Sequence, residues 1–591
     1  MIDLKGAPFF LDSEGIAWVH DTLQKMTIEK KIGQLFCPLG LSGRKKDLRY
    51  LTQEIGIGGI MFRPAKGEKA QEIHRFLQCN SEIPLLIGGN LEAGGSGAAT
   101  DGTAFGLPLQ TAATDDMTLA KALGTVSCAE GAAVGLNWAF APIVDIDCNF
   151  RNPITNLRTF GSDPARVLAM AKAYLAAAAE QGVATAIKHF PGDGVDERDQ
   201  HLLTSVNSLS CEAWDDSYGK IYRALIQAGA KSVMVGHIAQ PAWQKRLSGN
   251  ADLRETIPAT LSKELMTGLL RERLGFNGLI VTDASPMAGF RAAMKREDAV
   301  PLSIAAGADL FLFVRDMATD FGYMLQGCQS GVLSTERLDT AVTRILALKA
   351  SLGLHKKAKE QIVPDKKALT ILGCEAHQAL AKQCAEKSIT LVKDTQQLLP
   401  ITPQKYKRVY LNVLENNLEK NSLLNAKLVK ALEQEGFTVT LRDRGAVAGV
   451  SLLLSSEKSS LRQKAKIVWR ARHSVGELLG GASELSDKYD LVIYAANFET
   501  ASENTVIRLN WKGFMGIGND VPWFVREIPT LFVSLANPYH LLDVPMVKTY
   551  INAYSASDVT LAALMEKLTG RSAFTGVSPV DASCGREDAL Y

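Results

Sequence analysis

Residues 182–201 read GVATAIKHFPGDGVDERDQH. The segment GVATAIKHF has the composition of a short buried β-strand. Pro191, Gly192 and Gly194 follow it, so the chain must leave regular structure and enter a loop. That loop and the strand end carry a lysine, an arginine, two histidines and four acidic residues. Ionisable side chains thus follow the carboxyl end of a strand, which is where parallel α/β folds bind their ligands.

The same strand-then-helix pattern recurs through the first 350 or so residues. Further apolar runs are IGGIMF, PLLIGG, LNWAFAPIVDI, KSVMVGH, GLIVTDA and GADLFLF, and amphipathic stretches such as residues 165–182 lie between them. An eighth strand is expected near QLFCPLG or in a short, weak segment. This repetition predicts an N-terminal (β/α)8 TIM-like barrel. A Rossmann-like open sheet is the competing interpretation, but no glycine-rich dinucleotide turn accompanies the run.

The pattern changes after residue 354. The segment HKKAKEQIVPDKK is charged and poor in apolar residues, which is typical of an exposed linker. A second αβ series follows, with four or five parallel-type strands that indicate an α/β/α sandwich. We therefore expect a catalytic barrel domain over 1–355, a linker and connecting helix over 356–385, and a sandwich domain over 386–591.

The composition restricts the classes of partner. The chain has 591 residues, 46% of them hydrophobic, and a formal net charge of +2 spread along its length. This balance argues against nucleic acid or an anionic membrane as a partner. The chain has no apolar run of transmembrane length, and its first residues do not resemble a signal peptide. Nine scattered cysteines without a CxxC pair favour reduced thiols, so a cytoplasmic location is expected.

Two sites carry acidic or basic groups suited to catalysis. Asp283 ends the apolar strand of GFNGLIVTDASPM, where it can attack an electrophilic carbon or simply cap the next helix. Asp199 and His201 are two residues apart in a loop that we expect to be extended, so their side chains should point the same way. A carboxylate beside an imidazole suits proton transfer near neutral pH, although a loop salt bridge or a helix cap explains the pair equally well.

Other polar residues are expected at the same mouth of the barrel. Lys188 and His189 end one strand, His237 ends another, and Arg158 lies in a turn-rich loop. A lysine at a buried strand end needs a ligand or an acidic partner. Arg158 can bind a ligand or pair with Asp145 or Asp163, and His237 has a structural role as its alternative. No phosphate loop, HExxH motif or calcium-loop spacing is present, so neither a metal nor an organic cofactor is expected.

Together these motifs resemble those of a known family. The chain is similar to glycoside hydrolase family 3 β-N-acetylglucosaminidases of the two-domain type found in Gram-positive bacteria. The resemblance rests on KHFPGDGVDERDQH, GFNGLIVTDASPM, KIGQLF, PATLS, the LN–AP–D and R–FG elements, SITLVKD and LANPYHLLD. It covers nearly the whole chain, and the motifs are specific as a set.

The resemblance implies residue roles. Asp283 matches the family's nucleophile, His201 its general acid/base and Asp199 the dyad partner of that histidine. Most family 3 enzymes instead use a carboxylate as acid/base, often from the second domain, and the DxH loop marks the N-acetylglucosaminidase branch. The substrate-binding residues expected here are Arg158, Lys188, His189, Asn90, Glu92, His237 and Met287.

Two positions depart from the family pattern. The sequence FPGHG appears here as FPGDG, with Asp193 in place of a histidine that is usually structural. The D-x-E-G-G motif appears as NLEAGG, so Asn90 replaces a substrate-binding aspartate. An amide still bonds a sugar hydroxyl but loses the contribution of charge, which Glu92 would have to replace.

The expected activity is exo-acting, retaining removal of terminal β-N-acetylglucosamine through a glycosyl-aspartate intermediate. Its substrates would be small carbohydrates, namely GlcNAc-containing oligosaccharides or muropeptides of cytoplasmic peptidoglycan recycling. The alternatives are a family 3 phosphorylase, a hydrolase of another β-glycoside, and a catalytically inactive sugar-binding protein. The sequence leaves open whether the protein is a monomer or a dimer.

Overall fold

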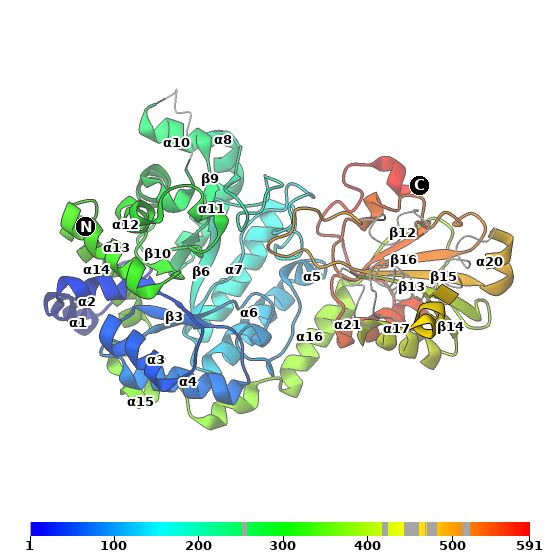
Figure 1. The fold of residues 1–591 in the computed structure, drawn as a ribbon, viewed down its shortest axis with the longest axis horizontal. Coiled ribbons are helices and arrows are strands. Elements are labelled where there is room, and N and C mark those ends of the chain that lie inside the picture. The colour runs from blue at the N-terminus through cyan, green and yellow to red at the C-terminus, as the bar shows by residue number, and fades with distance from the viewer. Residues whose placement is uncertain are drawn as a thin grey trace. The chain divides into compact units, whose positions relative to one another are not determined.

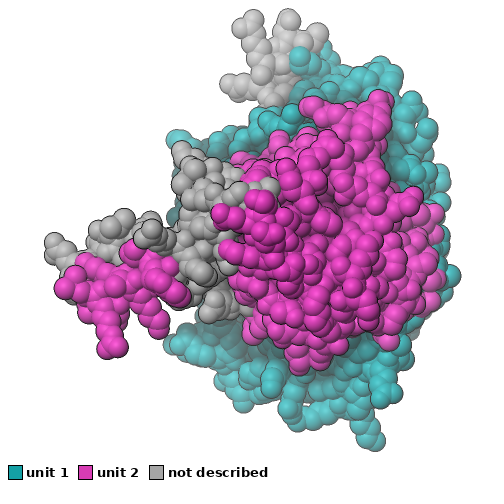
Figure 2. Space-filling view, turned by 90° about the vertical axis from the view of Figure 1, so that its right-hand side faces the viewer, with its two compact units in different colours: residues 1–112, 116–381, 502–505 teal, residues 113–115, 382–501, 506–591 magenta. Residues whose placement is uncertain are grey.

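The computed structural model describes residues 2–250, 257–415, 423–442, 460–466, 468–469, 482–509, 511 and 520–591. The chain forms two compact units, coloured separately in Figure 2. Unit 1 comprises residues 1–112, 116–381 and 502–505, and unit 2 comprises residues 113–115, 382–501 and 506–591. Each unit has its own sheet.

Unit 1 is built on parallel strands whose order follows the chain. Seven of them form one sheet in the order β10-β8-β6-β5-β4-β3-β2. Their bounds are β2 (Leu39–Gly40), β3 (Gly59–Phe62), β4 (Leu86–Gly89), β5 (Trp138–Ala139), β6 (Ala184–Phe190), β8 (Ser232–Val235) and β10 (Leu279–Thr282). Every strand of this sheet pairs parallel with its neighbours.

The two edges of this sheet are joined through two further strands. β1 (Phe36–Cys37) pairs parallel with β11 (Phe311–Leu312). The Thr282 N–H donates to the Leu310 carbonyl at 3.1 Å, and the Gly58 N–H donates to the Phe36 carbonyl at 3.1 Å. β1 and β2 are separated by one residue in the segment QLFCPLG, so together they act as one strand of the barrel. With this strand and β11 included, eight strands close into a barrel. The predicted barrel and the location of its eighth strand are confirmed.

The barrel strands are apolar because helices cover them from outside. All seven residues of β6 are buried, as expected for a strand enclosed on both faces. The surrounding layer contains long helices that alternate with the strands (Figure 1). They include α1 (Ser13–Gln24), α2 (Ile28–Gln34), α4 (Gly67–Asn80), α6 (Met117–Ala133), α7 (Pro164–Glu180), α12 (Arg296–Ala306), α13 (Met317–Ser330) and α14 (Thr335–Ser351).

Helix α7 illustrates how the sequence sets these boundaries. The Asp163 carboxylate accepts the Ala165 N–H at 3.0 Å, and Pro164 occupies the first helical position. Both residues are favoured at helix starts. The helix ends at Glu180, and Gly182 takes a left-handed backbone with φ of 68°. The helix expected over 165–182 therefore begins one residue earlier and ends two residues earlier.

The segment expected to be an exposed linker belongs to unit 1, and most of its residues are exposed, as expected. Arg75 on α4 donates to the carbonyl of Val363 at 3.2 Å, and Gln71 donates to the carbonyl of Asp365 at 3.0 Å. The backbone of this charged segment thus satisfies side chains of the barrel's helical layer. The connecting helix expected within 356–385 forms as α16 (Glu375–Ser388), and the division between the units falls inside it.

Unit 2 contains a mixed six-stranded sheet in the order β12-β17-β16-β15-β13-β14. The strands are β12 (Thr390–Asp394), β13 (Arg408–Glu415), β14 (Thr438–Leu441), β15 (Leu491–Asn497), β16 (Thr530–Ser534) and β17 (Thr549–Asn552). Five strands are parallel, as expected, but the edge strand β12 runs antiparallel to β17. Such an edge strand is common on an otherwise parallel sheet.

Both faces of this second sheet are covered. Val409 and Leu411 of β13 belong to one buried apolar cluster, whereas Tyr410 and Leu414 belong to another. Alternate residues of a strand point to opposite faces, so the two clusters lie on the two sides of the sheet. Helices of this unit include α17 (Leu423–Gln434), α20 (Ala482–Lys488) and α21 (Asp558–Leu568). None of the helices in the described part of the chain is long and apolar enough to cross a lipid bilayer.

Candidate active site

Asp283 directly follows β10, at the carboxyl end of the barrel strands. Its carboxylate Oδ1 accepts the Ala284 N–H at 2.7 Å, and its Oδ2 lies 4.0 Å from Nε2 of His189. The side chain is 12% exposed, so a ligand can reach it. Burial by itself raises the pKa of this carboxyl, but the imidazoles around it outweigh burial and hold the pKa below its ordinary value. Asp283 is therefore ionised near neutral pH.

The Asp199–His201 pair is a tight unit. Oδ1 of Asp199 accepts both the His201 N–H at 2.8 Å and the His201 Nδ1–H at 2.7 Å. An aspartate that bonds the N–H two residues on forms a turn, so the segment is not the extended loop expected from the sequence. Asp199 has no exposed side-chain surface, whereas 28% of the His201 side chain is exposed. With Nδ1 held by the carboxylate, Nε2 is the atom available for proton transfer.

The dyad and Asp283 lie at the same end of the barrel. Thr204 donates from Oγ1 to the carbonyl of Gly289 at 3.0 Å, which joins the loop after the dyad to the loop after β10. A methyl group built on Gly289 would lie 2.5 Å from the Gln200 carbonyl, so the two loops touch. His201 is also among the groups whose charge lowers the pKa of Asp283. The two predicted catalytic groups therefore meet in one place.

Glu92 is the centre of a charged cluster beside this pair. It accepts Lys188 Nζ at 2.5 Å, Arg158 Nη2 at 2.9 Å and Arg158 Nε at 3.0 Å. Burial opposes ionisation of Glu92, but the two cations hold its pKa far below the ordinary value. Arg158 thus pairs with Glu92 rather than with Asp145 or Asp163. Asn90, directly after β4, has an exposed side chain that is available to a ligand.

His189 is held by an acidic residue that the sequence did not single out as its partner. Asp145 is 1% exposed and accepts the His189 Nδ1–H at 2.7 Å and the His189 main-chain N–H at 3.0 Å. The Nε2 atom of His189 is thereby turned toward Asp283. Asp145 follows the apolar run of LNWAFAPIVD, and its place after a barrel strand, like that of Asp283, was the signal that could have found it.

His237 and Met287 both bond the carbonyl of Ala284, the residue that follows Asp283. The two ring nitrogens of His237 contact Thr260 Oγ1 at 2.9 Å and the Ala284 carbonyl at 3.0 Å. Burial lowers the pKa of this fully buried histidine. This geometry supports the structural alternative, in which His237 holds the backbone that carries Asp283. Met287 precedes α11 (Ala288–Arg291) and is 8% exposed. Substrate binding by either residue stays a prediction.

Asp193, at the position that departs from the family pattern, is a buried structural residue. Its Oδ1 accepts the Gly194 N–H at 2.8 Å and the Asn152 side-chain amide at 2.9 Å, and Gln200 donates to its Oδ2 at 3.3 Å. Burial, and next the charge of Asp145, raise the pKa of Asp193 to about 7. Gln200 precedes His201, so Asp193 helps to shape the loop that carries the dyad.

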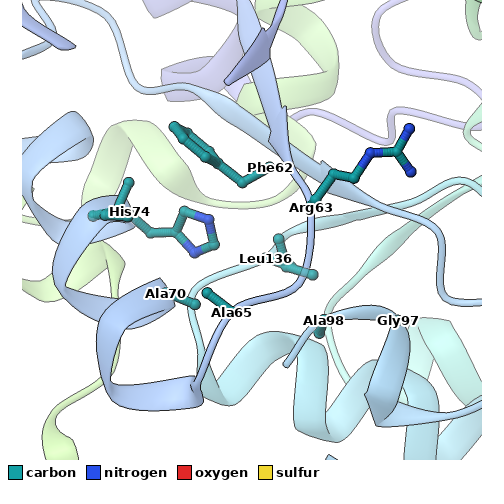
Figure 3. Close-up of a pocket in the computed structure, with 9 residues that line it drawn as sticks. Phe62, Arg63, Ala65, Ala70, His74, Gly97, Ala98 and Leu136 are labelled. Carbon is teal, nitrogen blue, oxygen red and sulfur yellow. The ribbon is translucent and has the colours of Figure 1, made fainter. Parts of the chain in front are cut away.

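A small cavity lies elsewhere in unit 1, against α4 (Figure 3). Its volume is about 30 Å³, and it is lined by Phe62, Arg63, Ala65, Ala70, Ile73, His74, Gly97, Ala98 and Leu136. His74 donates from Nδ1 to the Val134 carbonyl at 2.7 Å, and burial lowers its pKa to about 4. The space admits one or two waters but no sugar ring. Among the described residues, no group of three His, Cys, Asp or Glu side chains is placed to hold a metal ion.

The mouth of the barrel thus combines an ionised carboxylate, two imidazoles that are held by carboxylates, two cations and the amide of Asn90. These groups suit nucleophilic attack with proton transfer on a polyhydroxylated substrate. The family model described as "Glycosyl hydrolase family 3 N terminal domain" matches residues 27–348. A "Beta-N-acetylglucosaminidase/beta-glucosidase" from Cellulomonas fimi is 45% identical over the full length of both chains. "Beta-hexosaminidase A" from Pseudoalteromonas piscicida is 30% identical over 61% of this chain and 63% of its own.

Solved structures agree with these sequence matches. A structure titled "Beta-glucoside phosphorylase BglX" superposes with a TM-score of 0.88 and 43% identity, covering 99% of both chains. A family 3 β-N-acetylglucosaminidase from Paenibacillus sp. str. FPU-7 has a TM-score of 0.74 over 95% of this chain and 99% of its own, and its 23% identity supports the fold alone. This protein is a glycosidase that belongs to glycosyl hydrolase family 3.

Proposed function

We propose that the protein is a retaining, exo-acting glycosidase that removes terminal β-linked N-acetylglucosamine through a covalent intermediate on Asp283. The observation that carries this proposal is the meeting of Asp283 with the Asp199–His201 dyad at one end of the barrel. The name of the Cellulomonas fimi relative, which is matched over its full length, supports the choice of sugar.

In the first step, Oδ2 of Asp283 attacks the anomeric carbon. We assign this oxygen because Oδ1 is occupied by the Ala284 N–H. His201, protonated on Nε2, gives that proton to the glycosidic oxygen as the bond to the leaving group breaks. Asp199 accepts the Nδ1–H of His201 throughout, which stabilises the imidazolium and fixes which nitrogen transfers the proton.

In the second step, the neutral Nε2 of His201 takes a proton from water while the water oxygen attacks the anomeric carbon. The ester bond breaks, and Asp283 returns to its carboxylate form. Each step inverts the configuration at the anomeric carbon, so the overall reaction retains it. In this proposal Arg158, Lys188 and Asn90 contact sugar hydroxyls, and Glu92 keeps the two cations in place. His189 lies between Asp145 and Asp283 and orients the sugar at the reacting carbon.

A second candidate activity is phosphorolysis of the same intermediate. The phosphorylase structure, 43% identical over 99% of both chains, favours it. Physically, a neutral imidazole repels an incoming phosphate dianion less than a carboxylate base would. Phosphate would attack the anomeric carbon, and the products would be a sugar 1-phosphate and the free Asp283 carboxylate.

The test is a panel of nitrophenyl β-glycosides of GlcNAc, glucose and GalNAc, assayed with and without phosphate. We expect the highest kcat/KM for the nitrophenyl β-glycoside of GlcNAc. A phosphate-dependent rise in kcat with sugar 1-phosphate as product would identify phosphorolysis, and a preference for glucose would identify a β-glucosidase. No turnover of any glycoside would favour an inactive sugar-binding protein. Small GlcNAc-containing oligosaccharides or muropeptides of cytoplasmic wall recycling remain the substrates that we propose.

A further inference from the structure

A short segment far along the chain contacts the proposed dyad. Residues 502–505 belong to unit 1 by their contacts, although the residues on either side of them in sequence belong to unit 2. The main-chain N–H of Glu503 donates to Oδ2 of Asp199 at 2.6 Å. The two residues are 304 positions apart, so this contact is a feature of tertiary structure and not of the dyad's own turn.

The bond completes the hydrogen bonding of Asp199. Oδ1 of Asp199 is shared by the main-chain and ring N–H groups of His201, and Oδ2 is bonded to Glu503. A carboxylate with no exposed side-chain surface carries a large desolvation cost unless its oxygens are bonded. The Glu503 N–H therefore holds the Asp199 carboxylate in the rotamer that faces His201.

The backbone of Glu503, rather than its side chain, carries this contact. Its φ is 69°, a left-handed conformation that is uncommon for a residue other than glycine. Its side chain is exposed. The left-handed backbone directs the N–H at Asp199 while the side chain remains in solvent.

We infer that Glu503 is a positioning residue for proton transfer: its main-chain N–H fixes Asp199 and, through Asp199, the ring of His201. This inference rests on the proposed acid/base role of His201. A sequence search for catalytic side chains does not find such a residue, because any amino acid except proline supplies the N–H. What the position requires is a residue that adopts positive φ.

Substitutions at residue 503 can test the main-chain N–H separately from the side chain. Glu503→Ala and Glu503→Gly both keep the N–H, and glycine also suits the left-handed backbone. Replacing residue 503 by its α-hydroxy acid analogue turns the amide into an ester, which removes the N–H and leaves the side chain intact. Glu503→Pro also removes the N–H but changes φ, so it is the second choice.

We expect the ester variant to lose about 10- to 100-fold in kcat/KM on a β-glycoside with a poor leaving group, the rate equivalent of one hydrogen bond to a charged group. On a dinitrophenyl glycoside, whose leaving group needs no proton, kcat/KM should stay within about threefold of wild type. The Ala and Gly variants should retain wild-type values on both substrates.

Two results would overturn the inference. An ester variant with wild-type rates on the poor leaving group would show that the N–H is dispensable. A large loss in Glu503→Ala, restored in Glu503→Gln, would place the function in the side chain instead. If His201→Ala itself showed no dependence on the leaving group, the proposed acid/base role would fail first, whatever the variants at 503 do. A thermal unfolding midpoint near that of wild type checks that each variant is folded.

Discussion

The carbonyl oxygen of His201 accepts a 2.9 Å hydrogen bond from the main-chain N–H of Ala288. Ala288 lies five residues after Asp283, so the loop of the proposed acid/base and the loop of the proposed nucleophile are bonded to each other. The bond fixes the backbone of the acid/base loop against the backbone that follows β10. The separation of the two proposed catalytic groups is therefore set by main-chain contacts, which side-chain substitutions at either group should leave intact.

Replacing Asp283 by asparagine should abolish turnover and leave the fold unchanged. Asparagine has the same shape and can still accept the Ala284 N–H, but its amide cannot form the glycosyl ester. We expect kcat to fall by about 10³-fold or more on every substrate. Asp298→Asn, at an exposed acidic residue on α12, is the matched control and should behave as wild type. Mass spectrometry of the wild-type enzyme with a 2-fluoro glycoside should find the label on Asp283, and a label on another residue would contradict the assignment.

Replacing His201 by alanine should slow the reaction according to the leaving group. Loss of a general acid costs about 10²- to 10⁴-fold where the departing oxygen needs a proton, and little where it does not. Added azide should restore turnover of activated substrates and yield a β-glycosyl azide, because azide needs no base. His20→Ala changes an exposed histidine on α1 and is the control. An equal loss on all leaving groups, with no rescue by azide, would exclude the acid/base role.

The sequence was sufficient to predict most of the architecture. Alternating apolar strands and amphipathic helices located the barrel strands, and the polar loops after them located the candidate site. Strand ends of a parallel barrel share one rim, so sequence position alone places Asp283 and Lys188 together. The antiparallel β12 and the packing of residues 356–381 within unit 1 depend on tertiary contacts that leave no local pattern.

The pairing of charges was harder to predict than their location. Arg158 was expected to bind a ligand or to pair with Asp145 or Asp163. Within the protein it is Glu92 that binds Arg158, and Asp145 holds His189 instead. Several acids and cations share one rim, and sequence spacing cannot rank distances across the barrel. The contact from Glu503 was beyond prediction, because its donor is a main-chain N–H and its acceptor lies 304 residues away.

Removing the charge of Glu92 should destabilise the protein and weaken substrate binding. Glu92→Gln leaves Arg158 and Lys188 close together without their anion, and breaking such a buried pair costs about 3–5 kcal/mol. The free energy of unfolding in guanidinium chloride measures this cost, and KM should rise because the two cations move apart. Glu180→Gln breaks the exposed pair with Lys121 and should change the free energy of unfolding by less than about 1 kcal/mol. Equal effects of the two substitutions would show that the cluster has no special role.

The pKa of Asp193 predicts a pH-dependent difference in stability between the wild type and Asp193→Asn. Burial raises the pKa of Asp193 to about 7 in the folded protein, whereas an unfolded aspartate titrates near about 3.9. Between these values the folded state binds the extra proton, so this residue's contribution to stability falls as pH rises. Asparagine can still accept the hydrogen bonds from Gly194 and Asn152, but it carries no charge. Loss of the Gln200 contact changes the free energy of unfolding by an amount that does not depend on pH.

The stability of Asp193→Asn relative to wild type should therefore increase from about pH 4.5 to about pH 7.5, by at least about 1 kcal/mol, the equivalent of one pKa unit. Denaturant unfolding at each pH measures the difference. Asp216→Asn, at a carboxylate whose side chain is 78% exposed, provides a control that should show no such trend. A constant difference between Asp193→Asn and wild type across this range would mean that Asp193 is already ionised at pH 4.5 in the folded protein.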